Sequence, residues 1–532
     1  MSDIPKEPVS RQVDVGGDQS EVITFLSDPS SYSPPVPNVE RIETHGALVF
    51  LAGDYAYKLK RAVKLPYLDF STIAKRESVC RHEIERNQEV ALDLYICARP
   101  IVRLPTGELA IGCTGEPIDW VVVMNRFDQA DLFDNLAQQG RLPVELMAPL
   151  AEQIATYHER AQPYRALDGN EVLAKVVTQT IMSFFEAGDP LELSQVHEYA
   201  GRIVAELNTQ SQLLRARSRH GYLRLCHGDL HLRNIVLRNG QPILFDAIEF
   251  DDNLAKIDVL YDLAFLLMDL WHRDLTTHAN HCFNTYVSKA VPTEGLNGLA
   301  AVPAFLAIRA AIRAMVAIDK AAVVDENQQC AARKEIADYF TLARQFLKAE
   351  EAVLVAIGGF SGTGKTTLAA ALSPKIGRAP GALHLRSDVE RKRMVGVDPL
   401  ERLPRHAYSE GASAKVYKRL CDRAEQALGA GQSVIVDATF LEAYHRRQIE
   451  RIAARSHVRF SGLWLEASQD CLVDRVTHRR NDASDADAAV VLGQLAKKST
   501  IKCWETFDTS EDFESVLSRV SFALRTTAYR RP

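Results

Sequence analysis

The stretch VLVAIGGFSGTGKT at residues 353–366 decides the architecture of the last third of this 532-residue chain. Its apolar start predicts a buried strand, and residues 359–366 match the phosphate-binding pattern GxxxxGK(S/T) ahead of a predicted helix. The glycines allow backbone N–H groups to surround phosphate oxygens, and the helix N-terminus adds positive potential. We therefore expect Lys365 to reach the β- and γ-phosphates of a nucleotide and Thr366 to hold Mg²⁺. The expected cofactor-binding set is Gly359, Ser361, Gly362, Thr363, Gly364, Lys365, Thr366 and Thr367.

Short apolar runs alternate with helical patterns throughout the region that follows. The runs are ALHL (382–385), SVIV (433–436) and FSGLWL (460–465). This alternation predicts a parallel sheet flanked by crossover helices. The boundary of this domain is expected near residues 350–351, at the end of a charged helix.

Two carboxylates at strand ends are candidates for catalysis and metal binding in this domain. Asp437 ends the strand SVIV and is expected to help Thr366 hold Mg²⁺, although a helix N-cap is the alternative interpretation. Asp388 follows the strand ALHL and could take a proton from a substrate hydroxyl. Arg391 would lie on the same helix face as Asp388, and the alternative for this pair is a cap beside a surface arginine.

Three arginines, Arg475, Arg479 and Arg480, share one predicted helical segment before the polar loop NDASDAD. Arginines on a mobile lid could close over the transferring phosphoryl group, so Arg475 and Arg479 are counted as catalytic candidates. The alternative is a solvated basic helix.

Together these features resemble small P-loop kinases of the gluconate kinase, polynucleotide 5′-kinase and zeta-toxin type. The resemblance covers about residues 352–515 and rests on the phosphate-binding loop, Ser-Asp-x-x-Arg (387–391), VIVDAT (434–439) and the arginine-bearing lid. It implies ATP as cofactor and Asp388 as catalytic base, and it leaves the acceptor open.

A second motif, HGDLHLRN at residues 227–234, fits the spacing H-x-D-x-x-x-x-N of protein-kinase catalytic loops. Asp229 would accept the proton of a substrate hydroxyl, and Asn234 would hold a metal ion. Asp246, twelve residues later at the end of ILFD, takes the metal-binding position, with a strand, an Asn239-Gly240 turn and a strand in between.

This part of the chain resembles the aminoglycoside phosphotransferase family, whose signature is close to HGDLHxxN…FD. It is still more similar to a bacterial family that joins such a domain to the P-loop kinase. Residues 44–76, 85–101 and 246–270 carry the likeness, which spans about residues 40–345. It implies Asp229 as base, Asn234 and Asp246 as Mg²⁺ ligands, His227 as a brace and Asp262 as an ordering carboxylate, for which a buried helix-start carboxylate is the alternative.

The lysine that would bind ATP in this module has two candidates. Lys58 and Lys60 lie two residues apart on one predicted strand and therefore face the same way. Either could pair with the α- and β-phosphates and with a helix glutamate, for which we expect Glu83; Lys58 is favoured, and two surface lysines are the alternative. The hairpin expected to cover the phosphates contains only Gly46, which differs from the G-x-G-x-x-G of protein kinases.

The expected fold is α/β and α+β multidomain: a bilobal kinase-like domain followed by a P-loop domain with a parallel sheet. Residues 1–40 are expected to form a polar tail and linker, 41–130 the N-lobe, 131–350 a helical C-lobe and 351–532 the P-loop domain. Within them we expect a hairpin over 47–63, a helix near 72–92, a strand at 120–127 and a hairpin over 234–250.

Charge and composition narrow the class of protein. The net charge is −6, whereas residues 352–532 hold 28 Lys and Arg against 21 Asp and Glu. This basic balance could favour phosphorylated ligands or nucleic acid, but solvated helix faces are the favoured interpretation of many of these residues. Nucleic acid is not favoured because few aromatic residues are interleaved with the basic ones. No run of 18 uncharged apolar residues, signal peptide or CxxC spacing occurs, so we expect a cytoplasmic protein with no membrane partner and reduced cysteines.

The sequence therefore predicts an ATP- and Mg²⁺-dependent kinase that phosphorylates hydroxyls of small molecules at two sites. Three alternatives stay open: a P-loop kinase regulated by the kinase-like domain, a polynucleotide 5′-hydroxyl kinase, and an ATP-gated switch that transfers no phosphate. The acceptors and the oligomeric state are open as well.

Overall fold

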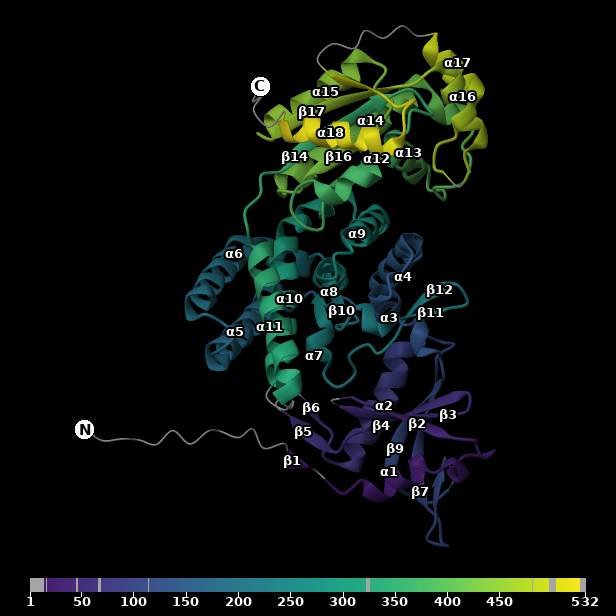
Figure 1. The fold of residues 1–532 in the computed structure, drawn as a ribbon, viewed down its shortest axis with the longest axis vertical. Coiled ribbons are helices and arrows are strands. Elements are labelled where there is room, and N and C mark those ends of the chain that lie inside the picture. The colour runs from purple at the N-terminus through teal and green to yellow at the C-terminus, as the bar shows by residue number, and fades with distance from the viewer. Residues whose placement is uncertain are drawn as a thin grey trace, which may run out of the picture. The chain divides into compact units, whose positions relative to one another are not determined.

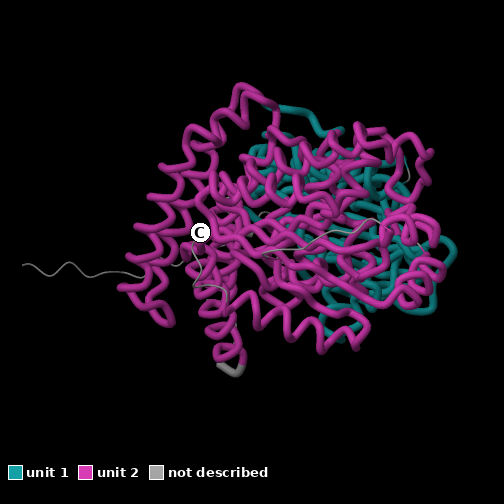
Figure 2. Tube along the Cα trace, turned by 90° about the horizontal axis from the view of Figure 1, so that it is seen from above, with its two compact units in different colours: residues 1–142, 160–164, 223–262 teal, residues 143–159, 165–222, 263–532 magenta. Residues whose placement is uncertain are grey.

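The computed structural model describes residues 14–15, 17–44, 46–65, 68–112, 114–321, 326–480, 482–496 and 504–526. The chain divides into two compact units (Figure 2). The first contains residues 1–142, 160–164 and 223–262, and the second contains residues 143–159, 165–222 and 263–532. The two units do not divide near residue 351, because the second unit contains the P-loop domain together with residues 143–159, 165–222 and 263–350 of the expected C-lobe.

The first unit is built on a six-stranded antiparallel sheet in the order β2-β3-β4-β9-β7-β8. Its strands are β2 (Val39–Glu43), β3 (Ala47–Ala52), β4 (Tyr55–Lys60), β7 (Tyr95–Arg103), β8 (Leu109–Ile111) and β9 (Glu116–Asn125). The predicted hairpin turns at Gly53, whose φ of 58° favours glycine. Helix α2 (Ile73–Gln88), capped by Thr72, packs on one sheet face through Cys80 and Ile84.

The remaining elements of this unit are short. They are β1 (Asp14–Val15), α1 (Ser20–Ser27), β5 (Val63–Leu65), β6 (Leu68–Asp69), α3 (Phe133–Gln138), β10 (Leu223–Leu225), β11 (Ile235–Arg238), β12 (Gln241–Leu244), α7 (Asp252–Ala255) and β13 (Lys256–Asp258). The hairpin β11–β12 turns at Asn239 and Gly240, both with positive φ, as the Asn-Gly pair predicts. Strand β12 ends at Leu244, so the expected strand over residues 242–250 is too long.

The expectation that residues 1–40 form only a polar tail and linker is wrong for residues 20–27. These residues form α1, whose Val22 and Leu26 are buried against Phe50 and Val121 of the sheet. Apolar positions four residues apart give this short helix one face to bury.

The second unit begins with helices α4 (Met147–Arg160), α5 (Gly169–Ala187), α6 (Leu193–Arg219), α8 (Val259–His272), α9 (Thr276–Ala290), α10 (Val302–Ala321) and α11 (Glu326–Phe346) (Figure 1). Residues Thr293–Ala321, which include α10, are long and apolar enough to cross a membrane. The most apolar 18-residue window of this segment is 72% buried inside the protein, as is typical of a core helix.

The unit continues with a five-stranded parallel sheet in the order β15-β16-β14-β17-β18, as the alternating pattern predicts. Its strands are β14 (Val353–Gly359), β15 (Leu383–Arg386), β16 (Val434–Asp437), β17 (Arg459–Glu466) and β18 (Glu505–Asp508). The helices are α12 (Lys365–Leu372), α13 (Ser387–Val395), α14 (Glu410–Gly429), α15 (Ala443–Arg455), α16 (Gln469–His478), α17 (Ala488–Leu495) and α18 (Phe513–Thr526).

Alternation along β14 explains why helices cover both faces of this sheet. Val355 and Ile357 pack against α12 and α18, while Leu354 and Ala356, also buried, point to the opposite side. Helices α14 and α15 contact the sheet as well. The carboxyl ends of β14, β15 and β16 therefore meet at one edge, where the phosphate-binding loop begins.

Candidate active sites

Strand β4 and helix α2 bring a lysine and a glutamate together beside Asp246. The Lys58 Nζ donates to Glu83 Oε1 at 2.7 Å and to Asp246 Oδ1 at 2.5 Å. Burial alone would lower the pKa of Lys58, but Asp246 and Glu83 raise it well above its usual value. This arrangement places Lys58, rather than Lys60, next to the expected metal ligand.

Lys60 forms a second, buried part of the same cluster. Its Nζ lies 2.5 Å from Glu83 Oε2 and 2.5 Å from Glu249 Oε1. Burial would raise the pKa of Glu83, but Lys58 and Lys60 together lower it to about 2. Burial raises the pKa of Glu249. Glu83 thus binds both lysines. Glu249 is a further functional candidate that the sequence motifs did not indicate, although it lies three residues after Asp246.

Within the catalytic-loop motif, Asn234 and His231 both lie against Asp229. The Asn234 Nδ2 donates to the Asp229 backbone oxygen at 2.9 Å and to its Oδ2 at 3.0 Å. Since the amide nitrogen makes both bonds, the amide oxygen is the atom that a metal ion would use. The His231 Nε2 lies 3.4 Å from Asp229 Oδ2.

The backbone that carries this motif is fixed by two buried groups. The N–H groups of His227 and Gly228 donate to the carboxylate of Asp262 at 3.1 and 2.9 Å. The His227 ring is 2.9 Å from the Phe245 carbonyl, and burial lowers the pKa of this imidazole.

Asp246 itself adopts the left-handed region with φ 61°, which a non-glycine residue occupies mainly at functional or strained positions. Gly46, the glycine of the β2–β3 turn, has no comparable positive φ.

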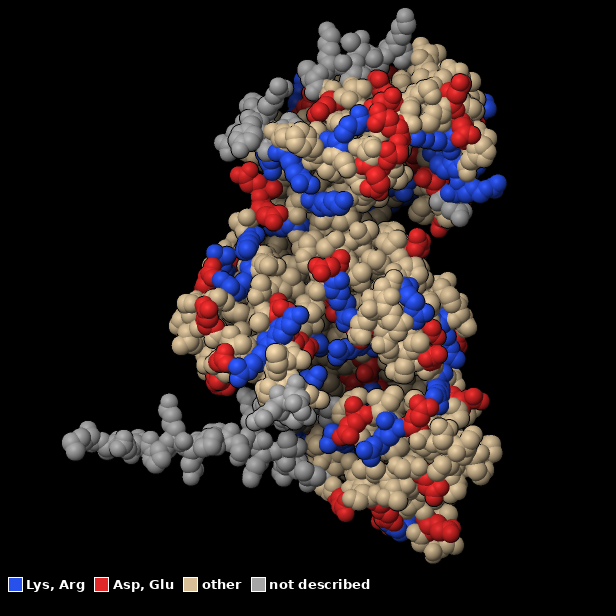
Figure 3. Space-filling view, in the orientation of Figure 1, with Lys and Arg blue, Asp and Glu red and all other residues tan. Residues whose placement is uncertain are grey.

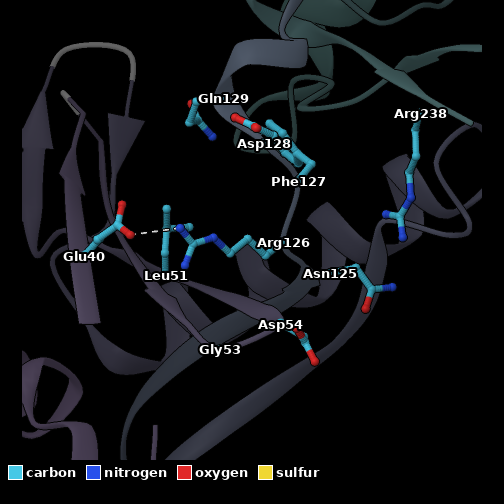
Figure 4. Close-up of a pocket in the computed structure, with 10 residues that line it drawn as sticks. All are labelled: Glu40, Leu51, Gly53, Asp54, Asn125, Arg126, Phe127, Asp128, Gln129 and Arg238. Atoms are coloured by element: carbon cyan, nitrogen blue, oxygen red, sulfur yellow. Dashed lines mark hydrogen bonds and ion pairs between the residues drawn. The ribbon is translucent and has the colours of Figure 1, made fainter. Parts of the chain in front are cut away.

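A cavity of about 570 Å³ opens in the first unit at the end of β9 (Figure 4). Arg126 reaches across it to Glu40, 2.9 Å away. Leu51, which also lines it, is paired with Ala56 on β4, and Lys58 lies two residues further along on the same sheet face. The full lining is Glu40, Leu51, Gly53, Asp54, Asn125, Arg126, Phe127, Asp128, Gln129 and Arg238.

The phosphate-binding loop joins β14 to α12 in the second unit. Gly362 and Gly364 have φ values of 89° and 82°, and a Cβ on Gly362 would lie 2.8 Å from the Leu472 carbonyl. The Lys365 Nζ donates to the Phe360 carbonyl at 2.8 Å, and burial lowers the pKa of this lysine. Of the other expected residues, Thr363 is buried and bonded to the Phe360 carbonyl, whereas Thr367 is exposed.

Gln494 on α17 is a second contact that the sequence did not indicate. The Ser361 N–H donates to Gln494 Oε1 at 2.9 Å, and the Gln494 amide donates to Ser361 Oγ at 3.1 Å. A side chain more than a hundred residues away therefore meets the loop, and only the fold reveals it.

Asp437 lies where a magnesium carboxylate is expected. The Thr366 hydroxyl donates to Asp437 Oδ2 at 2.5 Å, and His384 Nε2 of β15 lies 3.5 Å from the same oxygen. Burial would raise the pKa of Asp437, but His384, Lys365 and Arg386 lower it to about 2. Burial and the charge of Asp437 raise the pKa of Asp388, the candidate base at the start of α13. His384 was not predicted as a site residue. Its polar side chain within the otherwise apolar run ALHL is the signal that could have identified it.

The candidate arginines are placed differently from one another. Arg475 donates to the Gly362 carbonyl at 3.4 Å and to the Thr509 carbonyl at 2.6 Å, so it touches the phosphate-binding loop. Arg391 is buried, bonded to the Ala407 carbonyl at 2.7 Å. Helix α16 ends at His478, so the expectation of one helical segment carrying all three lid arginines is wrong for Arg479 and Arg480.

The polar loop after α16 is held by ion pairs. Asp482 lies 3.1 Å from Arg386, and Asp485 lies 3.1 Å from Lys392. Arg479 at the helix end donates to the Ala486 carbonyl at 2.8 Å. These contacts anchor the loop beside Asp388.

Family comparisons match both halves of the chain. A family model described as "Phosphotransferase enzyme family" matches residues 71–292, and one described as "AAA domain" matches residues 354–499. The expected union of an aminoglycoside phosphotransferase-like domain with a P-loop kinase domain is thereby confirmed. Two kinase-type domains point to phosphotransferase activity.

Similar proteins occur in mycobacteria. An uncharacterized protein of Mycobacterium tuberculosis (strain H37Rv) and another of Mycobacterium bovis are each 30% identical to this chain over 484 residues. The matched region covers 88% of this chain and 91% of each relative.

Two solved structures are similar to parts of the chain. An aminoglycoside phosphotransferase from Alicyclobacillus acidocaldarius is 17% identical, with 65% of this chain and 96% of that chain covered and a TM-score of 0.36. A gluconokinase from Sinorhizobium meliloti is 17% identical, with 34% of this chain and 98% of that chain covered and a TM-score of 0.23.

Proposed function

This chain belongs to the family of the mycobacterial proteins that it matches over 91% of their length, and we propose that it is an ATP-dependent phosphotransferase with two nucleotide sites. Each site would transfer the γ-phosphoryl group of ATP to a hydroxyl of a small molecule. The observation that carries the proposal is that each site holds a lysine together with carboxylate or amide groups of the kind that phosphoryl transfer needs.

In the first site Lys58 would contact the α- and β-phosphates while Glu83 holds its ammonium group in place. Asp229 would accept the proton of the acceptor hydroxyl as its oxygen attacks the γ-phosphorus. The oxygen ligands offered by Asn234 and Asp246 suit Mg²⁺, which would neutralise charge on the phosphates. The cavity beside Leu51 and Phe127 lies on the same sheet face as Lys58 and would receive the base of the nucleotide.

In the second site the backbone of residues 359–366 would surround the phosphates, with Lys365 on the β- and γ-phosphates. Thr366 and Asp437 form an oxygen pair that fits a magnesium ion. Asp388 would take the proton from the acceptor hydroxyl. Its raised pKa makes its carboxylate a stronger base than an ordinary aspartate. Arg475 touches Gly362, and the charge of Arg479 adds to burial in lowering the pKa of Lys365, so either arginine would approach the phosphates.

A small-molecule acceptor is favoured over nucleic acid. On the face shown in Figure 3, Lys and Arg side chains are interspersed with Asp and Glu and do not form a continuous basic track. Nucleic-acid binding depends on such a track of positive charge. We also propose a cytoplasmic location with no membrane partner.

Two substitutions in the full-length protein test the proposal. Lys365→Ala should reduce ATP turnover at the second site at least about 10²-fold, and Asp229→Asn should do the same at the first site alone. Each single variant should therefore keep the activity of the other site in a screen of sugars, sugar acids, nucleosides and oligonucleotides. Wild-type turnover by the double variant would contradict both assignments.

The alternatives give different results in the same experiment. If the first domain only regulates the second, Lys365→Ala alone should abolish all transfer. If the protein is an ATP-gated switch, cellular function should survive Asp229→Asn and Asp388→Asn but not Lys365→Ala.

A further inference from the structure

Strand β15 is the edge strand of the parallel sheet, and one side of it has no strand neighbour. The Leu383 N–H donates to Ser433 on the side of β16 at 2.8 Å. Because backbone groups alternate in direction along a strand, the Ala382 carbonyl and the His384 N–H point to the open side.

Two asparagines of α9 cover this open side. The Asn284 Oδ1 accepts from the His384 N–H at 2.7 Å, while its Nδ2 lies 3.2 Å from the Ala382 carbonyl. Asn280, which is buried, donates to the Pro380 and Ala382 carbonyls at 2.9 and 3.1 Å. The amide of Asn284 therefore makes the two bonds that a neighbouring strand would make.

The approach of α9 depends on a glycine. Gly381 has φ 95°, and a Cβ there would lie 2.7 Å from Asn280 Nδ2 and 2.5 Å from the Ser373 carbonyl. No L side chain fits that space without moving the asparagine or the backbone.

The strand that α9 contacts, β15, carries His384 and is followed by Asp388, both of which belong to the second candidate site. His384, whose backbone Asn284 binds, has its ring 3.5 Å from Asp437. The same strand runs into α13, which begins at Ser387 and carries Asp388 in its first turn. Helix α9 lies within the region matched by the phosphotransferase family and outside the region matched by the AAA domain.

We infer that Asn280 and Asn284 are positioning residues of the P-loop site, supplied by the phosphotransferase-family part of the chain. They fix the edge strand β15, and through His384 they fix the carboxylate of Asp437 for the metal-bound nucleotide. The inference rests on the proposed nucleotide site of the second domain. Groups that orient a metal ligand typically change metal affinity 10- to 100-fold when removed.

The test uses the full-length chain carrying Lys58→Met, so that only the second site binds nucleotide. Calorimetry measures the affinity for a nonhydrolysable ATP analogue with and without Mg²⁺. Asn284→Ala should weaken binding about 10-fold with Mg²⁺ and leave binding without Mg²⁺ unchanged. His384→Ala should have the same effect, and the double variant should be no weaker than either single one, because both act through one contact.

Arg378→Ala is the matched control. The Arg378 guanidinium also joins the helical region to the P-loop domain, through the Leu299 and Ala430 carbonyls, but it does not touch β15. It should leave the magnesium dependence unchanged. An equal loss of Mg²⁺-dependent affinity for the analogue in Arg378→Ala and Asn284→Ala would overturn the inference, since it would indicate general loosening of the interface.

A measurement on the unsubstituted protein supplements the variants. The His384 amide should exchange slowly with solvent deuterium although it lies on the open edge of the sheet. Rapid exchange there would overturn the inference. Failure of the Lys58→Met chain to bind the analogue at all would instead contradict the proposed function.

Discussion

Lys58 and Lys60 differ in what their ammonium groups touch, although both face the same side of β4. Lys58 bridges Glu83 to Asp246, whereas Lys60 bridges Glu83 to Glu249 and is 2% exposed. Burial would lower the pKa of Lys60, but Glu249 and Glu83 raise it. We therefore propose that Lys58 contacts the nucleotide and that Lys60 forms a structural ion pair.

Replacement of Lys58 should affect ATP turnover, whereas replacement of Lys60 should affect stability. In a chain that also carries Lys365→Ala, Lys58→Met should lower residual ATP turnover about 10²-fold with little change in stability. Lys60→Met should lower the free energy of unfolding by about 3–5 kcal/mol, because it leaves the buried Glu249 carboxylate without its lysine, whereas Glu83 keeps Lys58. Turnover assays and urea unfolding distinguish the outcomes, and the opposite pattern would reverse the assignment.

The side chains of a local motif lie together in the structure, as Asn234 and Asp229 do. The motifs around Asp229 and Lys365 are continuous in sequence, and their spacing alone indicated which side chains would meet. Glu249, His384 and Gln494 were missed because their partners lie far away in the chain, and contact across that distance depends on topology. The choice between Lys58 and Lys60 could not be made from strand alternation, which treats them alike.

At the scale of elements, the turns and alternations predicted two hairpins and part of the parallel sheet. The β11–β12 hairpin and the strands β14, β15, β16 and β17 occur where Asn-Gly and the apolar runs place them, whereas β18 was not predicted. Helix α1 was missed because it is only eight residues long and lies between polar segments. Its apolar positions gain stability only from the sheet that they cover.

Leu26 tests whether α1 is an integral part of the first unit. Its side chain is fully buried, so Leu26→Ala should lower the free energy of unfolding of this unit by about 2–5 kcal/mol. Hydrogen exchange of the β3 and β4 amides measures this. The exposed neighbour Thr24 serves as control, and Thr24→Ala should change stability by less than about 0.5 kcal/mol. Equal, small effects of both changes would show that α1 contributes nothing to the unit.

For the whole molecule, the division into units was the least predictable feature. The sequence placed a domain boundary near residue 351, where composition changes, yet the helical region and the P-loop domain form one compact unit. The contacts responsible are side chains such as Asn284 and Arg378, which no motif identifies. For this reason each site is best studied in the complete chain.

The central claim is that one chain holds two nucleotides. Calorimetric titration of the intact protein with a nonhydrolysable ATP analogue and Mg²⁺ tests it directly. Two bound analogues per chain are expected, and either Lys58→Met or Lys365→Ala should reduce this number to one. A single bound analogue per wild-type chain, or two that persist in both variants, would contradict it.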